Sequence, residues 1–321
     1  MGLFNDWVEG EYGWTTILVI VIFFTLITIW FYYTRDKYEP EPFSRILVAY
    51  FYGMISVIPA LIISLIAVYF VSFNILLTGI IIAPVIEEFT KGYFVVHLSK
   101  HDSFDGPLDG IIYGSMVGSG FATIENLLYG FSTSTLFSIN EGVELTFYRS
   151  LAQIIGHPLY TGLMGAGVGA YKVGLKNNQY NLIWQSILFH GLWNGAASSS
   201  LAITFIGGLI IVAIISIIRL RDELQNAIEL DRKAFERGYY EQKQQYLEYM
   251  KNLNNRLFYR HSYPPINNIR ESDQSTYSQQ PNQINHKYPT KTDTVNQDDN
   301  IYGSNNNENH SSTDNSDNTV D

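Results

Sequence analysis

Long apolar segments dominate the first two thirds of this chain. The first runs from Trp14 to Tyr33, and others follow as far as about residue 218. Because an α-helix rises 1.5 Å per residue, roughly 20 apolar residues cross a hydrocarbon core about 30 Å thick. The pattern therefore predicts an all-α fold, a polytopic bundle of membrane-spanning helices.

We expect about seven transmembrane helices in this bundle. Their approximate bounds are 14–33, 46–71, 75–97, 108–130, 146–172, 180–200 and 202–218. Residues 1–218 would then form one transmembrane domain.

The polar last third of the chain divides into two segments. Residues 219–260 are dense in Leu, Glu, Gln, Lys and Arg and contain no proline, which predicts a cytoplasmic amphipathic helix. Such a helix could bind a cytoplasmic partner or self-associate. Residues 261–321 are rich in Asn, Ser, Asp, Gln and Thr. A segment of this composition cannot bury enough apolar area to offset its ordering entropy, so we expect a disordered, acidic and polar tail.

Basic residues mark one side of the membrane. The expected loops on the opposite side, together with residues 1–13, carry no Lys or Arg, and the one exception nearby is Arg149, at the outer end of the expected fifth span. Since cytoplasmic loops are enriched in Lys and Arg, the N-terminus is expected outside and the C-terminus in the cytoplasm. The residues that set this orientation are Arg35, Lys37, Arg45, Lys100, Lys172, Lys176, Arg219 and Arg221.

The composition also excludes several classes of function. The chain contains no cysteine, which rules out disulfides, thiolate metal sites and a cysteine nucleophile. Its net charge is -10, and no basic patch indicates a nucleic-acid partner. The partner that the hydropathy indicates is the lipid bilayer.

Three charged residues interrupt the third apolar segment. Glu87, Glu88 and Lys91 lie within a stretch that runs from about Ile75 to Val96. A charge at mid-bilayer costs roughly 2.5–3.5 kcal/mol, so these side chains need partners on other helices. Later segments supply polar residues at similar depth, namely Glu125, Asn126, His157, His190 and Asn194. We therefore expect one shared polar site, at or outside the membrane midplane, that opens to a water-filled cavity.

Helical spacing makes finer predictions about these residues. Glu87 and Lys91 are four residues apart and would share a helix face, whereas Glu88 would point about 100° away. His157 precedes Pro158, and one alternative is a helix kink whose freed carbonyl bonds the imidazole.

Glycines recur in the fourth and fifth expected spans. Small residues four positions apart let helix backbones approach closely in lipid, so these two spans are expected to pack together at the centre of the bundle. The glycines concerned are Gly114, Gly118, Gly120, Gly162, Gly165 and Gly169.

Two carboxylates, two imidazoles and an amide fit hydrolysis. Glu87 would act as general base on a water molecule, with Lys91 as its charge partner. A histidine and Asn194 would hold the oxyanion. The same groups could instead bind Zn²⁺, with Glu87 still as the base. The zinc ligands would be drawn from Glu88, Glu125, His157 and His190. The residues alone leave the metal-free and the zinc-assisted versions open.

Taken in order along the chain, these motifs resemble the PrsW family, which belongs with the CAAX prenyl endopeptidases among multi-pass membrane proteases. The resemblance covers residues 35 to about 200. Its motifs are Glu39-Pro40-Glu41-Pro42, the E-E-x-x-K of Glu87, Glu88 and Lys91, the segment from Phe121 to Asn126, His157-Pro158, and His190 through Asn194. The prenyl endopeptidases have histidine where this chain has Glu125, a departure that follows the PrsW pattern and argues against prenylated substrates.

The resemblance implies a protease that cuts membrane-anchored proteins in a prokaryotic cell membrane. In the family's best-known role the protease makes the first cut in an anti-sigma factor, on its extracytoplasmic side. The resemblance further implies that Glu87 and Glu88 are an essential acid pair and that His190 is an essential histidine. It does not decide whether a metal takes part.

Two other hypotheses use the same residues differently. A transporter or ion pathway would relay protons or cations through the buried charges, although the sequence shows no internal repeat of the kind common in transporters. A scaffold would act through the C-terminal helix and tail. Two other protease types are disfavoured, because the chain has no H-E-x-x-H motif and no aspartate deep within an expected span.

Overall fold

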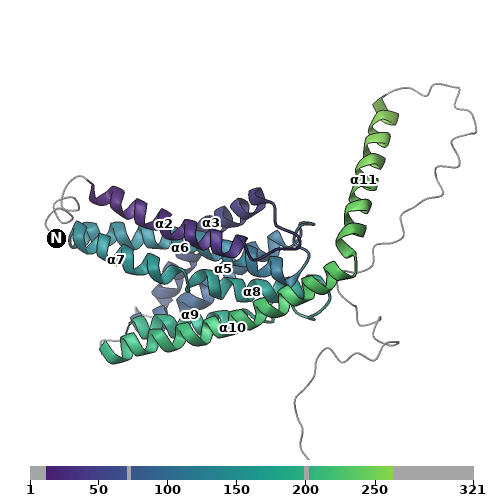
Figure 1. Cartoon of the computed structure of the whole chain (residues 1–321). Coiled ribbons are helices and arrows are strands. Elements are labelled where there is room, and N and C mark those ends of the chain that lie inside the picture. The colour runs from purple at the N-terminus through teal and green to yellow at the C-terminus, as the bar shows by residue number, and fades with distance from the viewer. Residues whose placement is uncertain (1–11, 71–73, 199–201, 263–321) are drawn as a thin grey trace, which may run out of the picture. The chain divides into compact units, whose positions relative to one another are not determined.

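The computed structural model describes residues 12–70, 74–198 and 202–262 (Figure 1). Within these ranges the chain forms helices joined by short connections, and no strand is present. The predicted all-α fold is therefore confirmed. The expected tail lies outside the described residues, except for its first two positions.

The helices follow one another without any intervening sheet. In chain order they are α2 (Gly13–Tyr33), α3 (Phe43–Phe70), α4 (Ile75–Leu77), the π-helix η1 (Thr78–Ile82), α5 (Ala83–Leu98), α6 (Pro107–Leu136), α7 (Ile139–Gln153), α8 (His157–Lys172), α9 (Ile183–Ala197), α10 (Ala202–Glu236) and α11 (Tyr239–Ser262).

Two of the described helices, α2 and α3, are long and apolar enough to cross a membrane. Three of the other expected spans form shorter helices, because α5, α8 and α9 contain 16, 16 and 15 residues. The predicted count of seven crossings is therefore not confirmed by helix length and composition.

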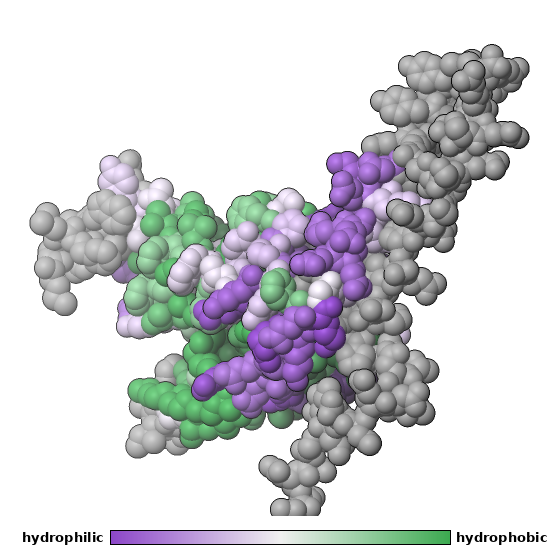
Figure 2. Space-filling view, turned by 45° about the vertical axis from the view of Figure 1, so that its right-hand side comes forward, coloured by the Kyte–Doolittle hydropathy of each residue, from purple (hydrophilic) through white to green (hydrophobic). Residues whose placement is uncertain are grey.

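Helix α2 places its apolar side chains outward and its hydroxyls inward. Val19, Leu26 and Trp30 are each more than half exposed. Thr25 and Thr28 are buried, and the Thr28 hydroxyl donates to the carbonyl of Phe24 within the helix. Figure 2 shows hydrophobic surface (green) gathered on part of the molecule, apart from the hydrophilic surface (purple). An exposed apolar face over a buried polar one is the arrangement expected of a helix that meets lipid.

Helix α6 lies at the centre of the bundle, since every residue from Pro107 to Thr123 is buried. It packs most extensively against α8 and also against α3 and α7. The close contact with α8 depends on glycine. A Cβ added at Gly110 would lie 2.1 Å from the carbonyl oxygen of Gly165, and one added at Gly118 would lie 2.4 Å from that of His157. The predicted close packing of these helices is confirmed, although Gly120 faces α3, where Tyr50 is its nearest neighbour.

The expected fifth span is not one helix. Helix α7 ends at Gln153, residues 154–156 form a turn, and α8 begins at His157. Pro158 explains the break, because proline has no N–H to donate and is tolerated only in the first turn of a helix. The prediction of a continuous helix over 146–172 is wrong, and His157 occupies a helix start rather than a helix middle.

The C-terminal helices also differ from the expectation. Helix α10 continues without interruption through residue 218, so the predicted boundary there does not coincide with a helix end. The expected helix over 219–260 is instead divided at Gly238, whose φ of 72° is a conformation that glycine adopts readily. Beyond it, Lys243 of α11 pairs with Glu39, at 2.7 Å, and with Asp105. The division into three domains stays a prediction.

Candidate active site

The acid pair of α5 is held by a fully buried lysine. The Lys91 ammonium donates to Glu88 Oε1 at 2.6 Å, whereas Glu87 Oε2 lies 3.9 Å away. Lys91 also lies 4.4 Å from the centre of the Phe121 ring on α6. The helical spacing predicted that Glu87 and Lys91 share a helix face, and the two do form an ion pair, although it is longer than the contact of Lys91 with Glu88. The i,i+3 contact is the short one, because the ammonium turns toward the bundle interior, where Glu88 points.

Glu88 orients His190 of α9. The Nδ1 atom of His190 lies 2.9 Å from Glu88 Oε1, and the ring stacks on Tyr160 with centroids 5.5 Å apart. Because an ionised carboxylate only accepts hydrogen bonds, Nδ1 carries a proton, and in the neutral imidazole Nε2 then keeps its lone pair. Thr161 donates to the other oxygen of Glu88, at 3.2 Å. Glu88 therefore positions the histidine, and a second group facing Nε2 could use its lone pair.

His157 joins two charged groups. Its Nδ1 atom lies 3.0 Å from the Lys91 ammonium, which can only donate, so Nδ1 is the acceptor. Nε2–H then donates to Glu125 Oε2 at 2.8 Å. Arg149 of α7 pairs with the same Glu125 oxygen at 3.0 Å. The alternative of a helix-kink role for the His157 imidazole is wrong, since the imidazole bonds side chains of two other helices.

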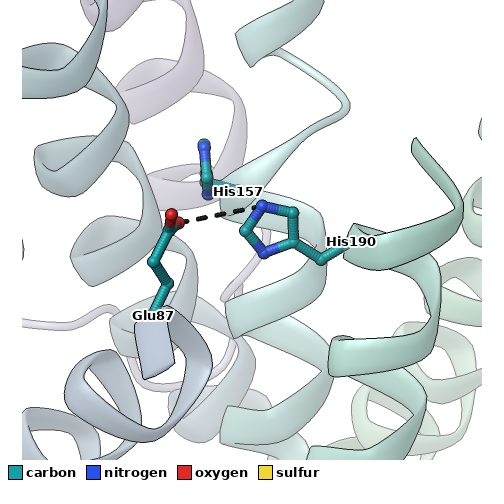
Figure 3. Close-up of side chains that lie close together, drawn as sticks. All are labelled: Glu87, His157 and His190. Atoms are coloured by element: carbon teal, nitrogen blue, oxygen red, sulfur yellow. Dashed lines mark ion pairs between the residues drawn. The ribbon is translucent and has the colours of Figure 1, made fainter. Parts of the chain in front are cut away.

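Glu87 is the carboxylate left over from this network. Glu88 is matched by Lys91, and Glu125 is matched by Arg149. The Oε2 atom of Glu87 is buried and makes no hydrogen bond within the described residues. It lies 3.7 Å from Nε2 of His190 (Figure 3). A desolvated oxygen without a donor is costly, so this atom is positioned for something that the protein itself does not supply.

A pocket of about 350 Å³ opens over these groups. This volume is within the range of small-molecule and substrate sites. Side chains from five helices, α5 to α9, form its wall. The polar residues around it include Glu87, Glu125, His157, His190 and Asn194. The four acidic and imidazole groups predicted to meet around one cavity do meet there.

The two predicted asparagines lie on different sides of the pocket. Asn194 donates one N–H to the carbonyl of Gly79, in the π-helix η1, at 2.9 Å. Gly191 makes this approach possible, because a Cβ there would lie 2.5 Å from the carbonyl oxygen of Ile80. Asn126 instead accepts from Arg149 Nε at 3.1 Å. Asn126 thus supports the cation behind Glu125.

Arg149 was not among the residues predicted for the site. Its position in the sequence was the available signal, since Arg149 is the one basic residue at the outer end of an expected span. Two buried residues of α8, Tyr160 and Thr161, were also not predicted for the site. A hydroxyl and an aromatic ring in an apolar segment carry no such signal, because both are common in membrane helices.

The side chains present fit a transition-metal site. One donor atom from each of Glu87, His157 and His190 lies within 4.8 Å of the others. Two imidazoles and a carboxylate form the ligand set of several catalytic zinc sites. The unbonded oxygen of Glu87 and Nε2 of His190 suit this role, whereas His157 would have to release Lys91 or Glu125 to bind a metal. This set differs from the predicted ligands, because Glu88 and Glu125 are occupied by cations.

Comparison with known proteins points to one family. Residues 41–219 match the model of the PrsW family intramembrane metalloproteases. The chain is 33% identical over 179 residues to the protease PrsW of Geobacillus kaustophilus, covering 51% of this chain and 72% of that protein. It is 30% identical over 205 residues to the protease PrsW of Oceanobacillus iheyensis, and the match covers 61% of this chain and 90% of that protein. It is 27% identical over 232 residues to the protease PrsW of Clostridioides difficile, and the match covers 68% of this chain and 94% of that protein. No solved structure matches the chain.

Proposed function

Because the chain belongs to the PrsW family and is therefore an intramembrane protease, we propose that it hydrolyses peptide bonds of membrane-anchored proteins in the pocket beside Glu87 and His190. The observation that carries this proposal is the buried Oε2 atom of Glu87. It has no hydrogen-bond donor of its own, faces a histidine lone pair and lies at a pocket wall. A water molecule there would meet two groups able to take its proton.

In the metal-free form of the reaction, Glu87 is the general base. The water oxygen forms a bond to the scissile carbonyl carbon while Glu87 takes one water proton. The proton passes to the amide nitrogen as the carbon–nitrogen bond breaks. The second N–H of Asn194 would donate to the oxyanion, since the carbonyl of Gly79 accepts the first.

In the zinc-assisted form, Glu87, His157 and His190 would hold the ion, and His157 would have to exchange its present contact with Lys91 or with Glu125 for the metal. Bound zinc would polarise the scissile carbonyl and lower the pKa of its water. The remaining residues act in the same way in both forms. Glu88 holds the tautomer of His190, Lys91 neutralises Glu88, and Arg149 neutralises Glu125.

We further propose that the chain crosses the cell membrane about seven times, with the N-terminus outside and the C-terminus in the cytoplasm. The predicted site then lies at or outside the midplane, which suits a first, extracytoplasmic cut in a protein such as an anti-sigma factor. The absence of cysteine makes this orientation directly testable. An impermeant thiol reagent should label intact cells that carry Thr135→Cys but not those that carry Lys176→Cys. The reverse pattern would overturn the proposed orientation.

The experiment that tests the function is cleavage of a single-span substrate by the purified protein. Glu87→Gln should lower the rate on the order of a thousandfold, because an amide cannot take the water proton. His190→Ala should lower it similarly. The matched controls are Glu144→Gln and His97→Ala, which change exposed residues of α7 and α5. Equal cleavage by all five proteins would contradict the site, and ion flux without cleavage would favour the transporter hypothesis.

A further inference from the structure

A second group of buried acids lies away from the active site, where the connection between α2 and α3 meets the start of α6. It consists of Asp36, Glu41 and Asp109, which are 5%, 4% and 2% exposed. One carboxylate oxygen from each lies within 4.8 Å of the others. We call this group the acidic triad. Three carboxylates at this separation repel one another unless something positive lies between them.

Asp36 shows that the triad is prepared for a ligand. Its Oδ1 atom accepts the backbone N–H groups of Tyr38 and Glu39, at 3.0 and 2.9 Å. Its Oδ2 atom is buried and has no hydrogen-bond partner within the described residues. Thus one oxygen fixes the direction of the carboxylate, and the other is desolvated without any compensating donor. Such an atom costs free energy in the unliganded protein.

The other two carboxylates are also held in place. The Tyr113 hydroxyl, on α6, donates to Glu41 Oε2, and the backbone N–H of Asp105 donates to Asp109 Oδ2 at 2.6 Å. Glu41 lies between Pro40 and Pro42, whose rings restrict the backbone on both sides. The site chemistry proposed above makes no use of this proline-flanked motif. Its rigidity suits a residue that must keep one orientation at a ligand.

Two basic side chains that interact with Asp105 or Asp109 make other contacts. Lys243 pairs with Glu39 and Asp105, which neighbour the triad. Lys172 donates to the backbone carbonyl of His101 at 2.6 Å. These lysines lower the local negative potential. Neither of these contacts supplies a donor to Oδ2 of Asp36.

We propose that the acidic triad binds one hard divalent cation, Ca²⁺ or Mg²⁺, and thereby fastens the α2–α3 connection to α6. All three donors are carboxylate oxygens, which Ca²⁺ and Mg²⁺ prefer, and the triad has no imidazole. Carboxylate oxygens bind Ca²⁺ at about 2.3–2.6 Å and Mg²⁺ at about 2.0–2.1 Å, and separations of at most 4.8 Å between the donor atoms are compatible with either ion. This site is separate from the one at Glu87, and it does not depend on the proposed function.

A shared proton is the alternative occupant of the triad. Burial, with smaller contributions from the charges of Asp36 and Asp105, raises the pKa of Glu41 to about 7, which favours a proton on this group of carboxyls. A proton would relieve the repulsion without any metal. The two hypotheses can be distinguished by experiment. Only a bound metal gives saturable cation binding and stabilisation by added cation at constant pH.

The test uses the purified full-length protein in detergent, stripped of metal and then titrated with Ca²⁺ or Mg²⁺ at constant pH. Bound cation and the midpoint of thermal unfolding, Tm, are measured together. At a cation concentration about a hundredfold above Kd, we expect a rise in Tm of about 5 to 10 °C. Asp36→Asn should abolish the rise while keeping the Oδ1 contacts to the backbone. Glu87→Gln should leave the rise unchanged, which assigns it to the triad rather than to the active site.

Glu41→Gln is the second variant, and it retains an oxygen for the Tyr113 hydroxyl. If Asp36→Asn fails to fold, loss of saturable binding in Glu41→Gln supports the proposal in the same way. The proposal is overturned if the wild type binds no cation at millimolar concentration. It is equally overturned if the folded triad variants bind cation as the wild type does. Stabilisation by acid alone, without cation binding, would assign the triad to a shared proton.

Discussion

The active site and the acidic triad are both groups of buried carboxylates, but they are balanced differently. At the active site, Lys91 and Arg149 neutralise Glu88 and Glu125 from within the protein, and two imidazoles lie between them. The triad consists of carboxylates alone, and Oδ2 of Asp36 has no donor. A group that carries its own cations can leave a single carboxylate free to react. A group without them depends on an occupant from solution.

Selective metal removal tests this comparison with the largest expected effect. A chelator selective for transition metals should lower cleavage on the order of a hundredfold or more, because a Lewis acid contributes several kcal/mol to catalysis. A chelator selective for Ca²⁺ should lower Tm and leave the rate of the folded protein nearly unchanged. Full activity after zinc removal, checked by metal analysis, would select the metal-free reaction.

Removal of the Lys91 ammonium should have the next largest effect. Lys91→Met leaves Glu88 buried without its ammonium, and breaking a buried pair in this way costs about 3–5 kcal/mol. The free energy of unfolding, measured in detergent with a chemical denaturant, checks this. Lys100→Met is the matched control, since Lys100 is exposed. If both variants were equally stable, the active-site carboxylates would not depend on an internal cation.

Gly118→Ala should disturb the active site and leave the acidic triad intact. The new methyl would lie 2.4 Å from the carbonyl oxygen of His157, so α6 and α8 must move apart. We expect a loss of about 1–3 kcal/mol in stability, typical of overpacking, and slower cleavage because His157 moves. Cation binding by the triad should persist. Gly207→Ala is the control, because a Cβ there meets nothing within 4 Å.

The smallest expected effect concerns a neutral hydrogen bond. Thr161→Val removes the donor that lies 3.2 Å from Glu88, while Lys91 and His190 still contact that carboxylate. We expect a loss of about 0.5–1.5 kcal/mol in the free energy of unfolding. Thr135→Val, at an exposed position of α6, serves as the control. A loss as large as that of Lys91→Met would show that hydroxyls, rather than charges, hold the site together.

Much of the active site could be predicted because charges in apolar segments are rare and must find one another. This reasoning brought Glu87, Glu125, His157 and His190 to one pocket, where the structure has them. It was incomplete on pairing, since the i,i+4 spacing of Glu87 and Lys91 did not predict that Lys91 forms its shorter contact with Glu88. Spacing describes one helix in isolation, whereas the pairing depends on which way the neighbouring helices turn each side chain.

The helix break before His157 also depends on the neighbouring helices and could not be predicted from the sequence of one segment alone. Pro158 is visible in the sequence, but whether proline kinks a helix or begins a new one depends on what the neighbouring backbone allows. The close approach of α6 at Gly118 places the His157 carbonyl and so directs its imidazole toward Lys91 and Glu125.

The amino-acid sequence by itself determined that this protein is helical, that its apolar faces belong in lipid, and that a few charged groups must meet. Hydropathy and the cost of desolvating a charge are properties of the residues, so they hold before any fold is known. Only the tertiary structure decided which carboxylate is left unpaired. Glu87 and Asp36 look like other acids in the sequence. Their free oxygens result from where the donors of other helices and loops happen to lie.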